Sequence, residues 1–173
     1  MNSLAASGVH SNAYNYPSFI RSGVDPRTGT YSLSLSLSSL LGNALSGPSL
    51  PLNLGFNALL GANVGFGNGW AMSFSSYNSR SGKLSLSTGA THMAALSENN
   101  FLIKDNKVSD VRVTRSGGDL IIEHKTGVLE VLSRSGSRSD EWLASRIYSP
   151  EGRVIYLDYQ LVAGRRIFSG IRD

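Results

Sequence analysis

Three closely spaced glycines, Gly65, Gly67 and Gly69, form the segment of this sequence that most resembles a ligand-binding loop. Glycine-rich loops bind phosphate when their backbone N–H groups lead into a helix, because a helix N-terminus attracts anions. Here the spacing differs from that of a dinucleotide-binding fingerprint, and residues 70–74 alternate between large apolar and small side chains, which predicts a strand. We therefore interpret the glycines as a structural turn and predict no bound cofactor.

The histidines and two adjacent carboxylates are the residues whose side chains suit metal binding and acid–base chemistry. His10, His92 and His124 are far apart, and none has a second ligand at metal-binding spacing. Asp140 and Glu141 are neighbours, so on a strand their side chains point to opposite faces and do not form a catalytic pair. The sequence predicts no metal site and no catalytic carboxylate pair.

Serine is abundant, but no serine lies in a Gly-x-Ser-x-Gly motif. The serine-rich residues 133–139 read as a flexible loop, and a nucleophile there has no evident base. We therefore predict a protein that is not an enzyme. An enzyme whose catalytic partners are distant in sequence remains the third hypothesis.

Composition limits the partners. The 173 residues carry a net charge of +4 and no cysteine, and basic and acidic residues are mixed within the last 73 residues, so we predict no nucleic-acid partner. The first eight residues have neither a basic start nor a long apolar stretch. We therefore expect no membrane insertion by this segment, and export by something other than its own signal peptide.

The strongest pattern in the chain is alternation with period two. A turn at residues 25–29 precedes residues 31–37, in which leucines alternate with serines, and the alternation returns at residues 50–56 and 70–74. Successive side chains of a strand point to opposite faces, so each run predicts a strand with one buried face. The predicted core contains the in-phase apolar residues of these runs: Leu33, Leu35, Leu37, Leu52, Leu54, Phe56, Trp70, Met72 and Phe74.

Similar signals continue to the end of the chain at spacings of about eight to twelve residues. They predict an all-β fold of antiparallel strands in a twisted sheet strip or sandwich, over residues 25–173, preceded by an extended arm over residues 1–24. The best helical candidate, near residues 139–146, is too short to be stable alone. Further strands are predicted at residues 83–88, near 93, and at 100–104, 110–115, 120–124, 128–133, 143–148, 153–159 and 165–171.

Four motifs occur in order at residues 23–31, 47–52, 65–70 and 86–89, with the structural positions Asp25, Pro26, Gly29, Tyr31, Gly65, Gly67, Gly69 and Trp70. Together they resemble the N-terminal region of bacterial rearrangement-hotspot (Rhs) proteins, the YD-repeat group that includes the C component of insecticidal toxin complexes. The similarity runs from about Gly23 to Asp173, and residues 147–153 and 156–159 also resemble a segment that precedes the repeats. The chain differs from the family in having no tandem Tyr-Asp repeats and no preceding spike-binding module, and no catalytic residue is transferred.

This resemblance implies a structural role. In such proteins, strips of β-sheet form a hollow shell that encloses a C-terminal toxin before delivery. The expected partners are then the remaining shell, the enclosed toxin and a secretion or injection machine. The expected location is synthesis in the bacterial cytoplasm followed by export as a secreted effector.

A second hypothesis from another class is a self-contained β-sandwich binding module, such as an adhesin or a carbohydrate binder. Its candidate ligand-stacking residues are Trp70 and Tyr77, because aromatic rings stack on sugars. This hypothesis requires the two rings to be accessible.

Overall fold

The computed structural model describes residues 19–42, 47–58, 64–97, 101–104, 111–136 and 139–173. All regular structure in these ranges is β-structure, in strands that pair antiparallel, which confirms the predicted all-β class. The described ranges contain no helix of the length and apolarity needed to cross a membrane.

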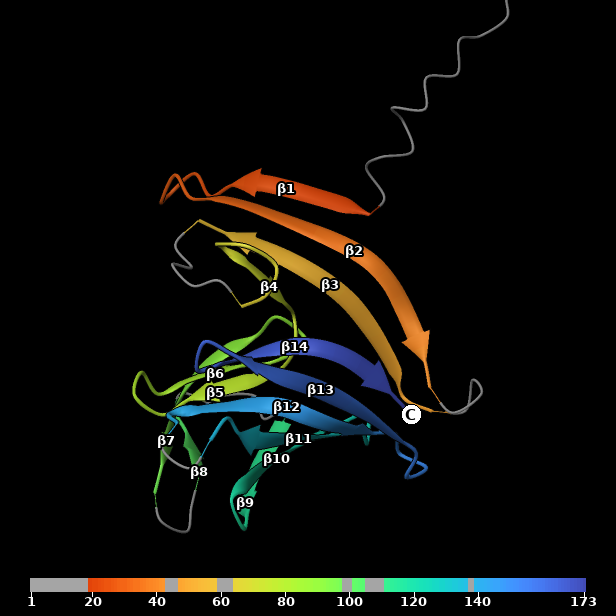
Figure 1. Cartoon of the computed structure of the whole chain (residues 1–173). Helices are drawn as coiled ribbons and strands as arrows, with labels where there is room; N and C mark the ends of the chain where they lie inside the picture. Colours follow the sequence, from red (N-terminus) through yellow and green to blue (C-terminus); the bar gives the residue numbers. More distant parts are fainter. Residues whose placement is uncertain (1–18, 43–46, 59–63, 98–100, 105–110, 137–138) are drawn as a thin grey trace, which may run out of the picture.

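The first part of the chain forms a four-stranded sheet, here called the N-terminal sheet, in the order β1-β2-β3-β4 (Figure 1). Its strands are β1 (Ile20–Val24), β2 (Tyr31–Leu41), β3 (Ser49–Asn57) and β4 (Trp70–Met72). The last residues of the predicted arm therefore form a paired strand, whereas residues 1–18, including His10, lie outside the described residues. Figure 1 shows this sheet arching over the rest of the molecule.

The remaining strands form a ten-stranded sheet in which eight strands curl into a nearly closed barrel. The order is β8-β7-β6-β5-β12-β11-β10-β9, and β9 lies beside β8. These strands are β5 (Ser76–Asn78), β6 (Lys83–Ser85), β7 (Thr91–Leu96), β8 (Phe101–Ile103), β9 (Val111–Ser116), β10 (Asp119–His124), β11 (Leu129–Arg134) and β12 (Glu141–Tyr148).

The sheet branches at β12. One edge of β12 pairs along its length with β11, whereas its other edge pairs first with β5, through residues 141–143, and then with β13, through residues 146–148. Strands β13 (Val154–Val162) and β14 (Arg165–Arg172) form a hairpin that leaves the barrel wall. Its tight turn places Ala163 and Gly164 at φ of 48° and 77°, which suits a two-residue hairpin loop.

The sequence located the strands of the barrel and the hairpin well, because glycine turns and alternation are local signals. Gly82, Gly117, Gly127, Gly152 and Gly164 all have positive φ at the predicted turns. Strand β5 was not predicted, and β12 includes most of the segment considered for a helix. The first residues of two predicted strands, Asn100 and Asp110, lie outside the described residues.

The predicted core is wrong in its location. The buried cluster lies mainly inside the barrel and at the base of the hairpin, and Leu50 of β3 is its one member from the N-terminal sheet among the described residues. Each buried Leu, Ile, Val or Phe side chain there contributes about 1.5–3 kcal/mol. Of the nine predicted core residues, Leu52 and Phe74 pack against this cluster, whereas Leu37 is 57% exposed. The buried cluster comprises Leu50, Tyr77, Leu84, Leu86, Ala94, Phe101, Val111, Leu120, Ile122, Leu132, Trp142, Ala144, Ile147, Ile155 and Leu157.

The physical reason is that alternation identifies the apolar face of a strand but not what covers that face. In the N-terminal sheet, Leu33 lies opposite Phe56 and Leu35 lies opposite Leu54, so the predicted face is formed. This face is only half buried, and a bulge at Leu37 interrupts the register between β2 and β3.

Candidate functional site

The turn at residues 25–29 forms as predicted and joins β1 to β2. The Gly29 N–H donates to the Asp25 carbonyl oxygen at 2.7 Å, and the Arg27 N–H donates to Asp25 Oδ1 at 2.8 Å. The bond from Arg27 is the main cause that lowers the pKa of Asp25. With Pro26 at its second position and Gly29 at a φ of 68°, this segment is a hairpin connection rather than a reactive site.

The glycine-rich segment also forms a structural turn. Gly65, Gly67 and Gly69 have φ values of 110°, 100° and 84°, and the Trp70 N–H donates to the Gly67 carbonyl oxygen at 3.3 Å. A Cβ on Gly69 would lie 2.6 Å from Cε2 of Phe56, so the backbone must approach that ring closely. The segment leads into strand β4 rather than a helix, and the phosphate-binding interpretation therefore has no support.

The structure does not bring Trp70 and Tyr77 together. Trp70 packs against Phe56, which also neighbours Tyr31, with ring centroids 5.3 Å and 6.4 Å apart. Tyr77 is only 2% exposed, and its hydroxyl donates to the Ala94 carbonyl oxygen at 3.4 Å. The stacking site that the carbohydrate-binding hypothesis requires is therefore not formed.

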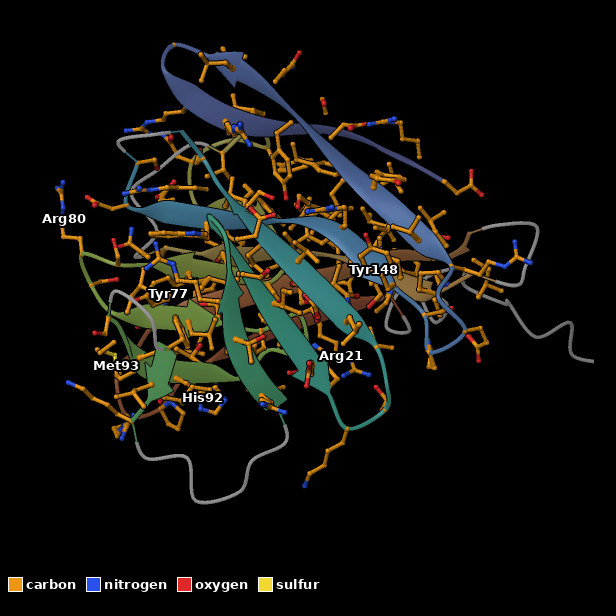
Figure 2. All side chains as sticks on the ribbon, turned by 90° about the horizontal axis from the view of Figure 1, so that it is seen from below. Arg21, Tyr77, Arg80, His92, Met93 and Tyr148 are labelled. Atoms are coloured by element: carbon orange, nitrogen blue, oxygen red, sulfur yellow. The ribbon has the colours of Figure 1, made fainter. Side chains whose placement is uncertain are left out.

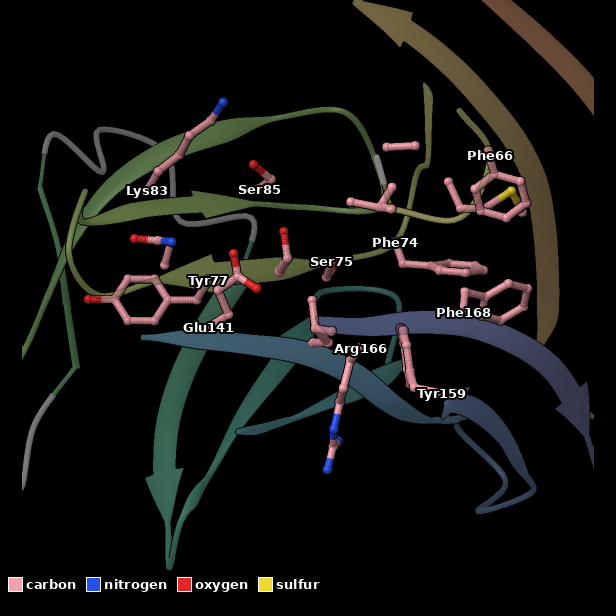
Figure 3. A pocket seen from close by; sticks show the side chains of 16 residues that line it. Phe66, Phe74, Ser75, Tyr77, Lys83, Ser85, Glu141, Tyr159, Arg166 and Phe168 are labelled. Carbon is pink, nitrogen blue, oxygen red and sulfur yellow. The ribbon is translucent and has the colours of Figure 1, made fainter. Parts of the chain in front are cut away.

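A cleft of about 320 Å³ lies between the outer face of the barrel and the β13–β14 hairpin (Figure 3). One end is lined by Phe66, Phe74 and Phe168, with the ring centroids of Phe74 and Phe168 5.1 Å apart. The other end carries polar side chains from β5, β6 and β12, including Lys83 and Glu141. Such a cleft can accommodate an apolar group at its aromatic end.

Ion pairs hold three surface carboxylates of the described residues, those of Asp119, Asp140 and Asp158. Asp140 pairs with Arg80 at 2.8 Å, and Figure 2 shows Arg80 projecting from the edge of the molecule. Asp158 pairs with Arg172 at 2.6 Å, and the hydrogen bond from this arginine lowers the pKa of Asp158. Asp140 therefore forms an ion pair at the surface with Arg80, and the exposed Glu141 that follows it is not part of this pair.

No group of three His, Cys, Asp or Glu side chains that could hold a metal occurs in the part of the chain that the structure describes. His92 lies half-buried on β7, opposite Leu84 of β6. Arg134, which the sequence assigned to a loop, belongs to β11 together with Ser133, where the predicted strand and the predicted loop overlapped.

Sequence reasoning missed a buried polar cluster around Glu130 of β11, a residue that is 2% exposed. Glu130 Oε1 accepts a hydrogen bond from Ser87 Oγ at 2.6 Å and lies 2.8 Å from His124 Nε2. The Ser87 N–H in turn donates to Ser75 Oγ at 2.8 Å. A glutamate inside the apolar run of residues 128–132 was the available signal, but its partners were too distant in sequence to infer.

The environment of Glu130 favours its ionised form. Burial raises the pKa of Glu130, but the hydrogen bonds from His124, Ser75 and Ser87 and the charge of His124 outweigh it, so that the pKa lies below its ordinary value. The second carboxylate oxygen, Oε2, is buried and makes no hydrogen bond within the described ranges. The cluster is therefore a buried hydrogen-bond network in which one acceptor, Glu130 Oε2, has no partner among the described residues.

The comparisons with known proteins bear on the fold. No protein-family model matches the chain, and no curated protein matches it. A solved structure of the Photorhabdus luminescens Tc holotoxin pore, with a mutation in TccC3, is similar over 88% of this chain, with a TM-score of 0.61 and 15% sequence identity. The aligned region spans 10% of that chain, and at this identity the likeness shows a shared antiparallel β fold.

Proposed function

We propose that this chain is a structural segment of a toxin-enclosing Rhs-type β-shell and has no catalytic site of its own. Its partners are the rest of the shell and a C-terminal toxin. The shell is made in the bacterial cytoplasm and exported through a secretion or injection machine. The segment forms part of the shell wall, and other parts of the assembly carry out toxin delivery.

The observation that carries this proposal is the fold likeness to one part of a long chain in a Tc holotoxin pore structure. The likeness extends over nearly the whole segment, including both sheets, although the two sequences are only 15% identical. It agrees with the four motifs that independently resemble Rhs proteins.

The surfaces of the N-terminal sheet support the same proposal. Its apolar face carries Leu33, Leu35 and Phe56 in half-buried positions, and Val24 at the end of β1 is 59% exposed. Within the described residues, β1 pairs only with β2 and β14 pairs only with β13. Unpaired edges and a partly covered apolar face are a liability for an independent module, but they suit a segment that adjoins further sheet.

The first experiment examines the natural polypeptide that carries this sequence, isolated from its own cell with an antibody against the barrel. We expect a product several times larger than 18.5 kDa with a C-terminal portion that resists added protease. A folded, monomeric 18.5 kDa product would contradict the proposal.

A matched pair of variants in that polypeptide tests the wall itself. Leu35→Asp places a charge on the apolar face of β2, and Ser34→Asp places the same charge on the opposite face. We expect Leu35→Asp to expose the C-terminal portion to protease and Ser34→Asp to leave it protected. Equal protection in both variants would argue against a role of this sheet in the enclosure.

A further inference from the structure

The Glu130 cluster connects parts of the barrel that share no backbone pairing. Glu130 lies on β11, and His124 ends the neighbouring β10. Ser75 directly precedes β5 and Ser87 follows β6, and in the sheet order β12 separates these segments from β11. The side-chain bonds from Ser87 and His124 to Glu130 therefore tie the β5–β6 side of the barrel to the β10–β11 hairpin.

The hydrogen bonds around Glu130 suit an ionised carboxylate, which only accepts. Oε1 is the acceptor that faces both Ser87 Oγ and His124 Nε2, and Oε2 has no partner among the described residues. A proton on Oε1 would compete with these two donors. A proton on Oε2 would create a buried O–H group that finds no acceptor in the described structure, which is unfavourable.

Among the described side chains that contact the Glu130 carboxylate, His124 is the one that can carry a charge. The side chains that contact the carboxylate from the β5–β6 side are the neutral hydroxyls of Ser75 and Ser87. On the flanking strands, the residues opposite Glu130 are Ile122 of β10 and Ile147 of β12, which are uncharged. No charge other than that of His124 acts on the carboxylate among the described residues.

We propose that Glu130 is an acid-sensitive clasp across the barrel: its ionised carboxylate holds the Ser75 and Ser87 segments against the β10–β11 hairpin, and its protonation releases those segments before the barrel unfolds. The main chain of β12 keeps its pairing with β11 when the clasp opens, because that ladder does not involve the Glu130 side chain. The clasp concerns the barrel itself and goes beyond the proposed shell role.

Amide hydrogen exchange of the 173-residue chain, corrected for the intrinsic pH dependence of exchange, tests the clasp. At pH 7 we expect slow exchange at Ser87, whose N–H is bonded to Ser75 Oγ. Because hydrogen bonds hold the pKa of Glu130 below the usual glutamate range, the pH is then lowered stepwise to about 2. We expect exchange in residues 73–90 to rise at least roughly tenfold on acidification, while residues 146–148 of β12, which pair with β11, stay protected. Loss of protection in all strands together, or no change in residues 73–90, would overturn the proposal.

Glu130→Gln removes the charge while keeping the shape, and Glu141→Gln makes the same change on an exposed residue of β12. We expect Glu130→Gln to show at pH 7 the exchange pattern that the wild type shows only in acid, and Glu141→Gln to match the wild type. Identical exchange in Glu130→Gln and the wild type at both pH values would refute the clasp.

Ser87→Ala serves if Glu130→Gln does not fold, because it removes one donor and leaves the buried charge and His124 in place. We expect faster exchange at pH 7 confined to residues 73–90. Unchanged exchange in that segment would equally refute the clasp.

Discussion

Tyr77 of β5 lies directly opposite Trp142 of β12, and their ring centroids are 5.6 Å apart inside the barrel. This contact joins the two halves of the barrel, since β5 to β8 lie on one side of it in the sheet order and β9 to β12 on the other. Phe101 completes the cluster with a ring centroid 4.8 Å from that of Tyr77. Packing between residues distant in sequence therefore holds the barrel together.

Trp142→Ala should destabilise the protein more than Trp70→Ala. Trp142 is 4% exposed and belongs to the buried cluster, so its truncation should lower the free energy of unfolding by about 3–5 kcal/mol. Trp70 is half-buried on the N-terminal sheet, so Trp70→Ala should lower the free energy of unfolding clearly less. Urea denaturation followed by circular dichroism measures both values. An equal or larger loss of stability for Trp70→Ala would contradict a core that lies inside the barrel.

The two apolar faces can be compared with leucines alone. Leu132→Ala removes a fully buried side chain opposite Leu120 and should lower the free energy of unfolding by about 2–5 kcal/mol. Leu37→Ala removes a side chain that is 57% exposed and should change stability by less than about 1 kcal/mol. Denaturant melting of the isolated chain provides the comparison, and a large loss for Leu37→Ala would show that its side chain is covered.

The structure shows why the sequence placed the core in the wrong sheet. Leu33, Leu35 and Leu37 alternate over a long strand, so they give a clear signal for one face, but alternation carries no information on the layer that covers it. The buried Tyr77 and Leu84 lie on strands of three residues each, which are too short to show a period. Their burial arises from the curling of the sheet, which depends on pairings between distant segments.

The turns were predictable for the opposite reason. Gly29 and Gly69 stand where the backbone has positive φ, a requirement set by neighbours in the sequence. The Glu130 cluster depends instead on Ser87, a residue that is 43 positions away. No local rule relates these two residues, so this candidate site required the structure.

Two glycines with similar backbone conformations separate the effect of φ from that of close packing. Gly69 and Gly89 have φ values of 84° and 89°, but a Cβ would contact Phe56 at Gly69 and nothing within 4 Å at Gly89. Gly89→Ala should therefore lower the free energy of unfolding only by the strain of alanine at a positive φ, roughly 1–2 kcal/mol. Gly69→Ala should lower it further, because its Cβ also meets Phe56. Thermal and denaturant unfolding of the two variants gives the difference, and equal losses would rule out tight packing of the glycine-rich turn on Phe56.

The stability of the chain should fall in acid through Glu130. Hydrogen bonds and the charge of His124 overcome the effect of burial and lower the folded-state pKa of this group. A carboxyl group whose pKa is lower in the folded than in the unfolded state contributes stability that is fully present above the unfolded pKa, about 4.3, and is lost as the pH falls through the folded pKa.

Melting temperatures measured from pH 7 down to about pH 3 test this dependence. We expect Glu130→Gln to be less stable than the wild type at pH 7 and to lose less stability in acid, because the group that takes up the proton is absent. Asp158→Asn, which alters an exposed ion pair, is the control and should retain most of the wild-type profile. Parallel profiles for Glu130→Gln and the wild type would exclude Glu130 as the source of the stability loss in acid.

An experimental structure of the complete natural polypeptide tests the central claim most directly. We predict that residues 25–173 form one part of a continuous antiparallel β wall around an enclosed chain, with the apolar face of the N-terminal sheet covered by other parts of the assembly. A structure in which these residues form a separate domain, with both faces of that sheet in solvent and no enclosed chain, would contradict the account.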